Sequence, residues 1–171
     1  MTGPPPPSPP AVTVRPATAA DIDTLVAMLV EVAGEGRWIG TEAPVDVERR
    51  RQRMTADVEG EDAIVLVAEA GGEPVGQLGL QLARYGVADL GMLVAAGWRG
   101  RGVGAALLAE AVRRAREAGA HKIALQVWPH NSAAIALYER FGFQREGYLR
   151  RHYRRRSGEL WDAVVMGLPL D

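Results

Sequence analysis

Apolar residues recur along the chain with two different periods, and each change of period separates strands from helices. Alternating or short continuous apolar segments, typical of strands, occupy residues 12–15, 63–70, 75–82, 87–94, 123–127, 143–153 and 160–168. Apolar positions three or four residues apart, typical of helices, occupy about 18–34, 46–58, 102–119 and 131–140. The order is therefore strand, two helices, three strands, helix, strand, helix, two strands. It predicts an α/β sandwich with a mixed sheet, neither doubly wound nor a barrel.

Cap and turn residues support the predicted ends of these strands and helices. Thr18, followed by Asp21 three positions later, predicts the N-terminus of the first helix, and Gly119 predicts a glycine cap at the end of the third. The segment 71–74 predicts the turn of a hairpin, and 156–158 predicts the turn of a closing hairpin. The first eleven residues are rich in proline and predict a flexible tail (1–11) ahead of a single domain (12–171).

Composition excludes several classes of function. The net charge of −1 gives no general attraction to nucleic acid or to an anionic membrane. The chain contains no cysteine, which excludes disulfides, thiolate metal sites and a cysteine nucleophile. Its three histidines are not at metal-ligand spacing, so no metal is expected. No apolar run approaches the roughly 18 residues that span a bilayer, so we expect a soluble, cytoplasmic protein.

A glycine-rich turn joins the strand at 87–94 to the helix that follows Gly102. Such a turn exposes unpaired backbone N–H groups at the positive end of a helix, while Arg99 and Arg101 add positive charge. The pattern therefore predicts an anion site, most simply for phosphate. It lacks the lysine of a P-loop and the spacing of a dinucleotide-binding turn. The structural alternative is a loop that needs glycine only for positive φ angles.

The second informative segment is the helix at 131–140. Asn131 is a good N-cap, and Tyr138 lies two turns later on the same face. Ala134, Leu137 and Phe141 share a row with Tyr138, so a purely structural role in the core is the alternative to a functional one.

Together the two segments resemble the GNAT superfamily of N-acetyltransferases. The first fits the family's Arg/Gln-x-x-Gly-x-Gly/Ala motif at Arg99, Gly102 and Gly104, and the second fits its Asn-x-x-Ala-x-x-x-Tyr-x-x-x-Gly-Phe motif from Asn131 to Phe143. The resemblance covers about residues 12–169, and it implies a mostly antiparallel sheet of about seven strands with about four helices on its faces. The closing segment is similar to branches that acetylate amino acids, protein N-termini, polyamines and phosphinothricin-like compounds.

The resemblance implies that acetyl-CoA is the acetyl donor. Its pyrophosphate would lie on the glycine turn, its pantetheine arm would pair with the preceding strand, and its thioester would lie near the second motif. The implied acetyl-CoA-binding residues are Met92, Leu93, Val94, Arg99, Gly100, Arg101, Gly102, Val103, Gly104, Asn131, Ala134 and Tyr138.

Catalytic roles follow from the same resemblance. Asp89, at the start of the strand that leads to the site, is the first candidate for a general base, with a strand-end or substrate-binding carboxylate as the alternative. Glu42 is the second candidate and lies with Trp38 in a loop expected over the acceptor. A backbone N–H near Leu93 is the expected oxyanion donor. Tyr138 is the candidate acid that protonates the departing thiolate.

We therefore expect a cytoplasmic enzyme that transfers acetyl directly to a small primary amine such as an amino acid or antimetabolite. The alternatives are a protein N-terminal acetyltransferase of the ribosomal-protein type and a non-catalytic acyl-CoA sensor. Homodimers are common in the family, and the closing hairpin is a plausible interface. The arginines at 145, 150, 151 and 154–156 most simply form a solvated face, although an acidic acceptor or RNA-rich surface would also suit them.

Overall fold

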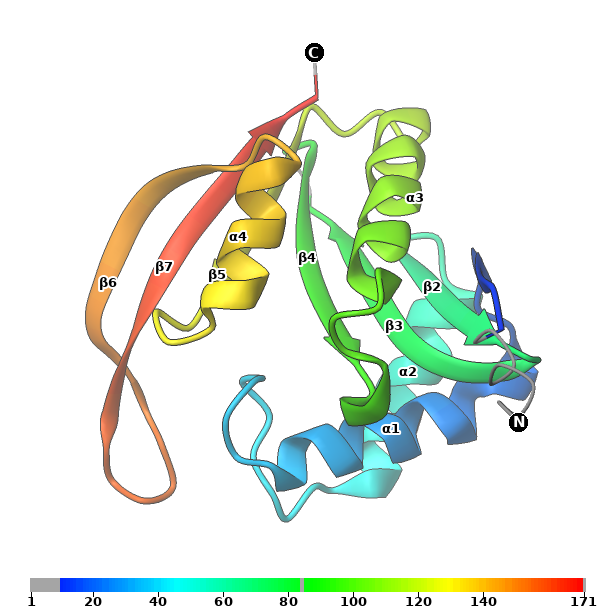
Figure 1. The fold of residues 1–171 in the computed structure, drawn as a ribbon, viewed down its shortest axis with the longest axis horizontal. Coiled ribbons are helices and arrows are strands. Elements are labelled where there is room, and N and C mark those ends of the chain that lie inside the picture. Colours follow the sequence, from blue (N-terminus) through cyan, green and yellow to red (C-terminus); the bar gives the residue numbers. More distant parts are fainter. Residues whose placement is uncertain (1–9, 84, 171) are drawn as a thin grey trace, which may run out of the picture.

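The computed structural model describes residues 10–83 and 85–170, which form one seven-stranded sheet with four α-helices (Figure 1). The strands lie in the order β1-β2-β3-β4-β5-β7-β6. The strands are β1 (Val12–Pro16), β2 (Ala63–Ala70), β3 (Glu73–Leu82), β4 (Val87–Val94), β5 (Lys122–Val127), β6 (Gln144–Arg154) and β7 (Leu160–Pro169). The helices are α1 (Ile22–Gly34), α2 (Val47–Glu59), α3 (Val103–Glu117) and α4 (Ser132–Arg140). The sequence-based order of elements is confirmed.

Every pair of neighbouring strands is antiparallel except β4 and β5, which run parallel. The mixed, mostly antiparallel sheet is therefore confirmed. One boundary differs from the prediction, because Glu73 and Pro74 belong to β3 and not to the preceding turn. A register shift at Ala68/Glu69 accommodates them, so Pro74 pairs with Glu69.

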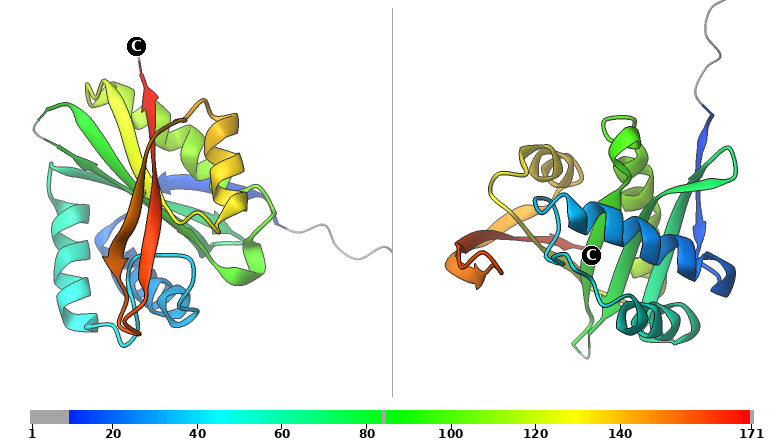
Figure 2. Two further views of the ribbon diagram at one scale, coloured as in Figure 1. Left: turned by 90° about the vertical axis from the view of Figure 1, so that its left-hand side faces the viewer. Right: turned by 90° about the horizontal axis from the view of Figure 1, so that it is seen from below.

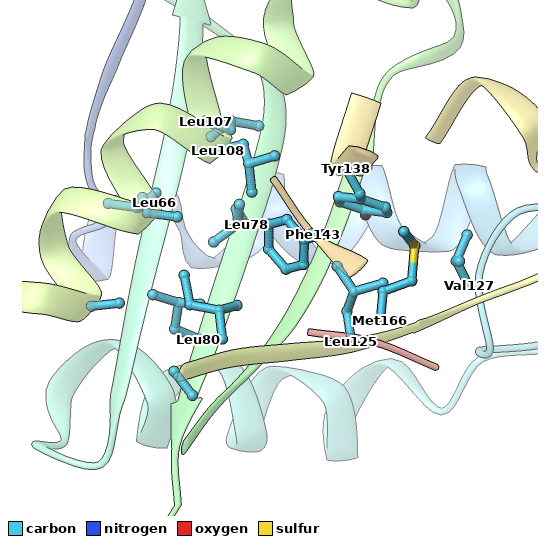
Figure 3. Packing of buried hydrophobic residues seen from close by; sticks show 14 of the residues in the cluster. Leu66, Leu78, Leu80, Leu107, Leu108, Leu125, Val127, Tyr138, Phe143 and Met166 are labelled. Atoms are coloured by element: carbon cyan, nitrogen blue, oxygen red, sulfur yellow. The ribbon is translucent and has the colours of Figure 1, made fainter. Parts of the chain in front are cut away.

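Helices cover the two faces of the sheet unequally (Figure 2). On one face α3 and α4 close the largest core, which includes Leu78, Leu107, Tyr138 and Met166 (Figure 3). On the other face α1 and α2 form two smaller apolar clusters, which reach β2 and β4. The outermost strand, β6, is mostly exposed along its length. The sheet surface around β5 to β7 therefore remains accessible on the α1/α2 face.

Local polar interactions set the ends of the helices. Asp21 accepts hydrogen bonds from Thr18 N–H at 2.7 Å and from Arg15 at 2.8 Å, but Ala19–Asp21 forms a 3-10 turn before α1 begins. Asn131 caps α4 through a 3.3 Å bond from the N–H of Ala134, as its position in the sequence predicts. Among the described helices, none is long and apolar enough to cross a membrane. Most of the predicted tail, residues 1–9, lies outside the described residues.

Candidate functional site

Strands β4 and β5 separate after a short paired stretch, and the space between them is the candidate site. They pair only at residues 87–89 and 122–124. Beyond Asp89, the β5-facing edge of β4 has no strand partner among the described residues. A cavity of about 760 Å³ occupies this opening. Its walls come from α1 and the loop after it, β4, the glycine turn, α3, β5, α4 and β6.

The backbone of β4 alternates in direction, which decides which N–H groups face the cavity. Ala95 N–H donates to Val75 O at 3.0 Å, so the odd-numbered residues at this end of β4 bond to β3. The backbone groups of Met92 and Val94 consequently face the opening, and those of Leu93 do not. The expected oxyanion donor, a backbone N–H near Leu93, can therefore be that of Met92 or Val94 but not that of Leu93 itself. Leu93 instead lines the cavity with a side chain that packs on α1.

The glycine turn presents a row of free donors. The backbone N–H groups of residues 100–105 have no acceptor among the described residues. Gly100 and Gly102 adopt φ angles of 71° and 82°, which favour glycine, and a Cβ at either would meet nothing within 4 Å. The N-terminus of α3 adds the positive end of a helix dipole. These donors and this open surface fit the diphosphate of a coenzyme A molecule.

In the structure the guanidinium groups of the two arginines of the turn contact other side chains. Arg99 forms two 2.7 Å bonds to Glu35, and its Nε donates to Val94 O at 3.1 Å. This ion pair is the main cause of a lowered pKa of the Glu35 carboxyl. Arg101 lies over the ring of Trp98 at 5.2 Å and does not line the cavity. The main-chain N–H groups of the turn are therefore its candidate anion donors.

Tyr138 projects from α4 beside Phe143, with its ring centroid 5.5 Å away (Figure 3). The residue is only 6% exposed, and burial raises the pKa of its hydroxyl to about 12. No described residue bonds to this hydroxyl, yet it is not sealed from the cavity that Tyr138 lines. Asn131 and Ala134 line the same wall. Tyr138 therefore packs in the core and also lines the cavity, so a structural role and a functional role are compatible at this position.

Of the three residues predicted for the acceptor, only Trp38 lines the cavity. Asp89 is exposed on the α1/α2 face and is the last residue of β4 that pairs with β5. Glu42 is held by the closing hairpin, because it pairs with Arg155 Nε at 3.3 Å and accepts from Arg156 N–H at 3.1 Å. A carboxylate already engaged by these donors is a poor general base, which weakens the case for Glu42. Asp89 has no such partner among the described residues, but it lies outside the cavity lining and would have to act through water.

Sequence reasoning missed the side chains that complete the acceptor end. Gln126 and Trp128 follow the last buried residues of β5, and Tyr153 comes from β6; all three line the cavity. The Tyr153 hydroxyl donates to Gln126 Oε1 at 2.5 Å, and its ring packs edge-on against Trp128 at 5.2 Å. Alternation along β5 placed Gln126 on the same face as the acceptor loop, but no local pattern linked it to Tyr153.

The arginine-rich hairpin also differs from the prediction at one position. Arg155 is 6% exposed, whereas the other arginines of the run are exposed. Its guanidinium lies over the rings of Trp161 and Trp128, at 4.4 and 5.3 Å, and donates to Gly40 O at 3.1 Å. Burial is tolerated because these contacts and Glu42 satisfy the charge. In residues 10–83 and 85–170, no three His, Asp or Glu side chains form a metal-ligand set.

The sequence and the fold were compared with those of known proteins. Residues 30–143 match the model of the acetyltransferase (GNAT) family. An L-methionine sulfoximine/L-methionine sulfone acetyltransferase of Pseudomonas paraeruginosa is 28% identical over 163 residues, covering 92% of this chain and 94% of that protein. A ribosomal-protein-alanine N-acetyltransferase of Brucella melitensis has a TM-score of 0.83 at 32% identity, covering 92% of this chain and 99% of that one. A phosphinothricin acetyltransferase of Sinorhizobium meliloti, solved with acetyl-CoA, has a TM-score of 0.83 at 24% identity, covering 93% and 88%.

Proposed function

The chain belongs to the acetyltransferase (GNAT) family, and from this premise we propose that it acetylates the primary amine of a small amino-acid-like molecule with acetyl-CoA. One observation carries the proposal. The free N–H groups of Gly100 and residues 102–105, the open edge of β4 and Tyr138 all belong to the lining of one cavity. They match the diphosphate, the amide-bearing arm and the reactive end of acetyl-CoA in that order.

Acetyl-CoA supplies an activated acetyl thioester when it is bound. The N–H groups of residues 100–105 would hold its diphosphate, and Asn131 lies where it can hold the pantetheine arm. The chain has no cysteine, so a cysteine-linked acetyl-enzyme is excluded and we propose direct transfer.

The residues of the chain then divide the work of transfer. A free alkyl ammonium has a pKa near ~10.4, so the acceptor must lose a proton, and Asp89 is the proposed base, acting through water. The N–H of Met92 or Val94 stabilises the oxyanion. Tyr138 remains protonated at neutral pH and donates to the departing thiolate. With a pKa of about 12 against ~8.5 for a thiol, this donation is uphill by about 5 kcal/mol, unless burial raises the pKa of the thiol as well.

A small acceptor suits the surroundings of the cavity. Gly40 and Glu42 are bonded to the hairpin that carries Arg155, so the acceptor loop is joined to β6 and β7 across this side of the site. A peptide would have to pass beside that connection, whereas a free amino acid would not. The relative from Pseudomonas paraeruginosa is itself named for two amino-acid derivatives.

Release of free thiol from acetyl-CoA tests the proposal, with amino acids, amino-acid antimetabolites and polyamines as acceptors. We expect release with amino-acid-like acceptors, its loss in Tyr138→Phe, and little release with polyamines. Absence of acetyl-CoA binding would refute the proposal.

A second candidate is acetylation of a protein N-terminus, because the Brucella melitensis structure is the more identical of the two solved structures compared above. Peptides that begin with alanine belong in the same assay. Faster release with such peptides than with any free amino acid would favour this candidate over the first.

A further inference from the structure

We infer that the acceptor carries an apolar or aromatic side chain, received in a preformed chamber on the α1/α2 side of the cavity. The inference rests on the proposed function and narrows its substrate class. We define the acceptor chamber as the cavity-lining residues on that side that carry a side chain, glycines left out. They are Val32, Trp38, Ile39, Leu93, Gln126, Trp128 and Tyr153.

The chamber is apolar and uncharged. Five of its seven residues are aliphatic or tryptophan, and the other two, Gln126 and Tyr153, are neutral and bonded to each other. Two charged side chains line the cavity. Arg140 lies on α4, whereas Arg99 is paired with Glu35 and its guanidinium lies 5.5 Å from the Trp38 ring centroid, at the edge of the chamber. Such walls favour apolar surface and oppose polar groups, because a buried polar group without a partner loses its hydration.

The nearby charges are used within the protein and do not enter the chamber. Arg155 and Glu42 lie behind the aromatic wall, paired with each other, and neither lines the cavity. The Arg155 guanidinium faces Trp128 and Trp161. It therefore supports the wall from outside and offers no countercharge to an ionic acceptor side chain.

The chamber is also held in place along its loop. Glu35 fastens the start of the loop to Arg99 and accepts the Trp38 Nε1–H at 2.7 Å. The His130 ring bonds to Arg37 O at 2.8 Å, and Arg155 bonds to Gly40 O at 3.1 Å. A wall fixed on both sides of Trp38 cannot easily rearrange to hydrate a polar acceptor side chain. We therefore expect the enzyme to select acceptors with apolar side chains.

Two acceptors of nearly equal shape test this selectivity. L-methionine and L-methionine sulfone differ by two oxygens, and among the described chamber residues two side-chain donors, the Gln126 amide N–H and the Trp128 Nε1–H, have no assigned acceptor. We expect kcat/KM with L-methionine or L-phenylalanine to exceed that with L-methionine sulfone, L-serine or L-lysine by about 10-fold or more.

Substitutions of Trp38 test whether the acceptor chamber causes this selectivity. Trp38→Ala should raise KM for L-phenylalanine by about 10-fold and leave KM for acetyl-CoA within about 2-fold, and Trp38→Phe should lie between it and the wild type. Tyr148→Phe, on exposed β6, is the matched control and should change neither constant. The graded pair keeps the test valid if the alanine variant folds poorly, which thermal unfolding would reveal.

The outcomes are distinct. Equal or faster turnover of the sulfone, or equal changes in both KM values in Trp38→Ala, would overturn the chamber and leave the proposed function standing. No turnover with any amine, despite acetyl-CoA binding, would overturn the proposed function itself.

Discussion

The two halves of the cavity differ in composition: one is lined mainly by main-chain groups and the other by side chains. The acetyl-CoA side consists largely of main-chain groups from two continuous segments, the end of β4 with its glycine turn and the start of α4. The acceptor side consists of side chains from α1, the loop after it, β4, β5 and β6. Main-chain donors recognise a ligand that is the same throughout a family. Side chains gathered from many segments can change one at a time, so this half determines which amine is accepted.

The difference also explains the two arginines of the glycine turn. Arg99 joins the turn to α1 through Glu35, so we expect recognition of the diphosphate to rely on the main-chain donors. One residue of the acetyl-CoA motif thereby positions Trp38 of the acceptor chamber, because Glu35 holds both side chains. This carboxylate is one of the connections between the two halves, and the bond of the His130 ring to Arg37 O is another.

The largest expected effect lies where the halves meet. Tyr138→Phe removes the only proposed acid while keeping the ring in its buried place against Phe143. We expect kcat to fall by about 10²-fold or more, with the acetyl-CoA Kd within about 2-fold. Stopped-flow or steady-state thiol release measures the first quantity, and calorimetric titration measures the second. Unchanged kcat would leave Tyr138 as a packing residue.

The two carboxylates proposed for the base come next. Asp89→Asn should lower kcat/KM by about 10²-fold and flatten the acid limb of its pH profile, because general bases contribute on that scale. Glu42→Gln should change kcat by less than about 3-fold and raise only the acceptor KM, because Glu42 holds the hairpin. The opposite ranking of the two variants would restore Glu42 as the base.

A glycine substitution tests the main-chain half. Gly102→Ala places a side chain at φ 82°, a conformation that costs an L-residue roughly 1–2 kcal/mol. We expect the acetyl-CoA Kd to rise about 10-fold, with the relative rates of different acceptors unchanged. Gly97→Ala, in the same turn but without positive φ or a close neighbour, is the matched control. Equal effects of the two changes would argue against a main-chain anion site.

The burial of Tyr138 predicts that the stability of the protein depends on pH. The folded protein keeps the Tyr138 proton up to a pKa of about 12, whereas the unfolded chain releases it near ~10. Stability from this residue is complete below pH ~10 and is lost as pH rises, by about 1.4 kcal/mol at pH 11. Urea unfolding at pH 8 to 11 should show this loss in the wild type relative to Tyr138→Phe. A difference that does not change with pH would mean that the hydroxyl is hydrated.

The smallest expected effect tests directly whether the acetyl-CoA half binds its ligand through main-chain groups. Arg99→Gln should change the acetyl-CoA Kd by less than about 3-fold at moderate salt, because the guanidinium is already neutralised by Glu35. The acceptor KM should rise instead, since Trp38 loses part of its support. A large, salt-dependent rise of the acetyl-CoA Kd would mean that Arg99 binds phosphate directly.

Sequence reasoning reached the elements whose causes are local. Asn131 caps a helix through the N–H three residues later, and Gly102 turns the chain between neighbouring elements. Contacts between distant segments were out of its reach. Glu35 and Arg99 are 64 residues apart, and Arg155 and Gly40 are 115 apart. For this reason the ion pair of Arg99 with Glu35 was not predicted, and Arg155 was expected in solvent.

By itself, then, the sequence determined the order of strands and helices, the glycine turn and the helix that carries Tyr138, because period, caps and turns act over a few residues. Tertiary structure alone decided that β4 and β5 part after Asp89 and that Met92 and Val94, not Leu93, face the opening. It also decided which side chains form the acceptor chamber. These features depend on strand register and on packing between distant segments, which no local pattern encodes.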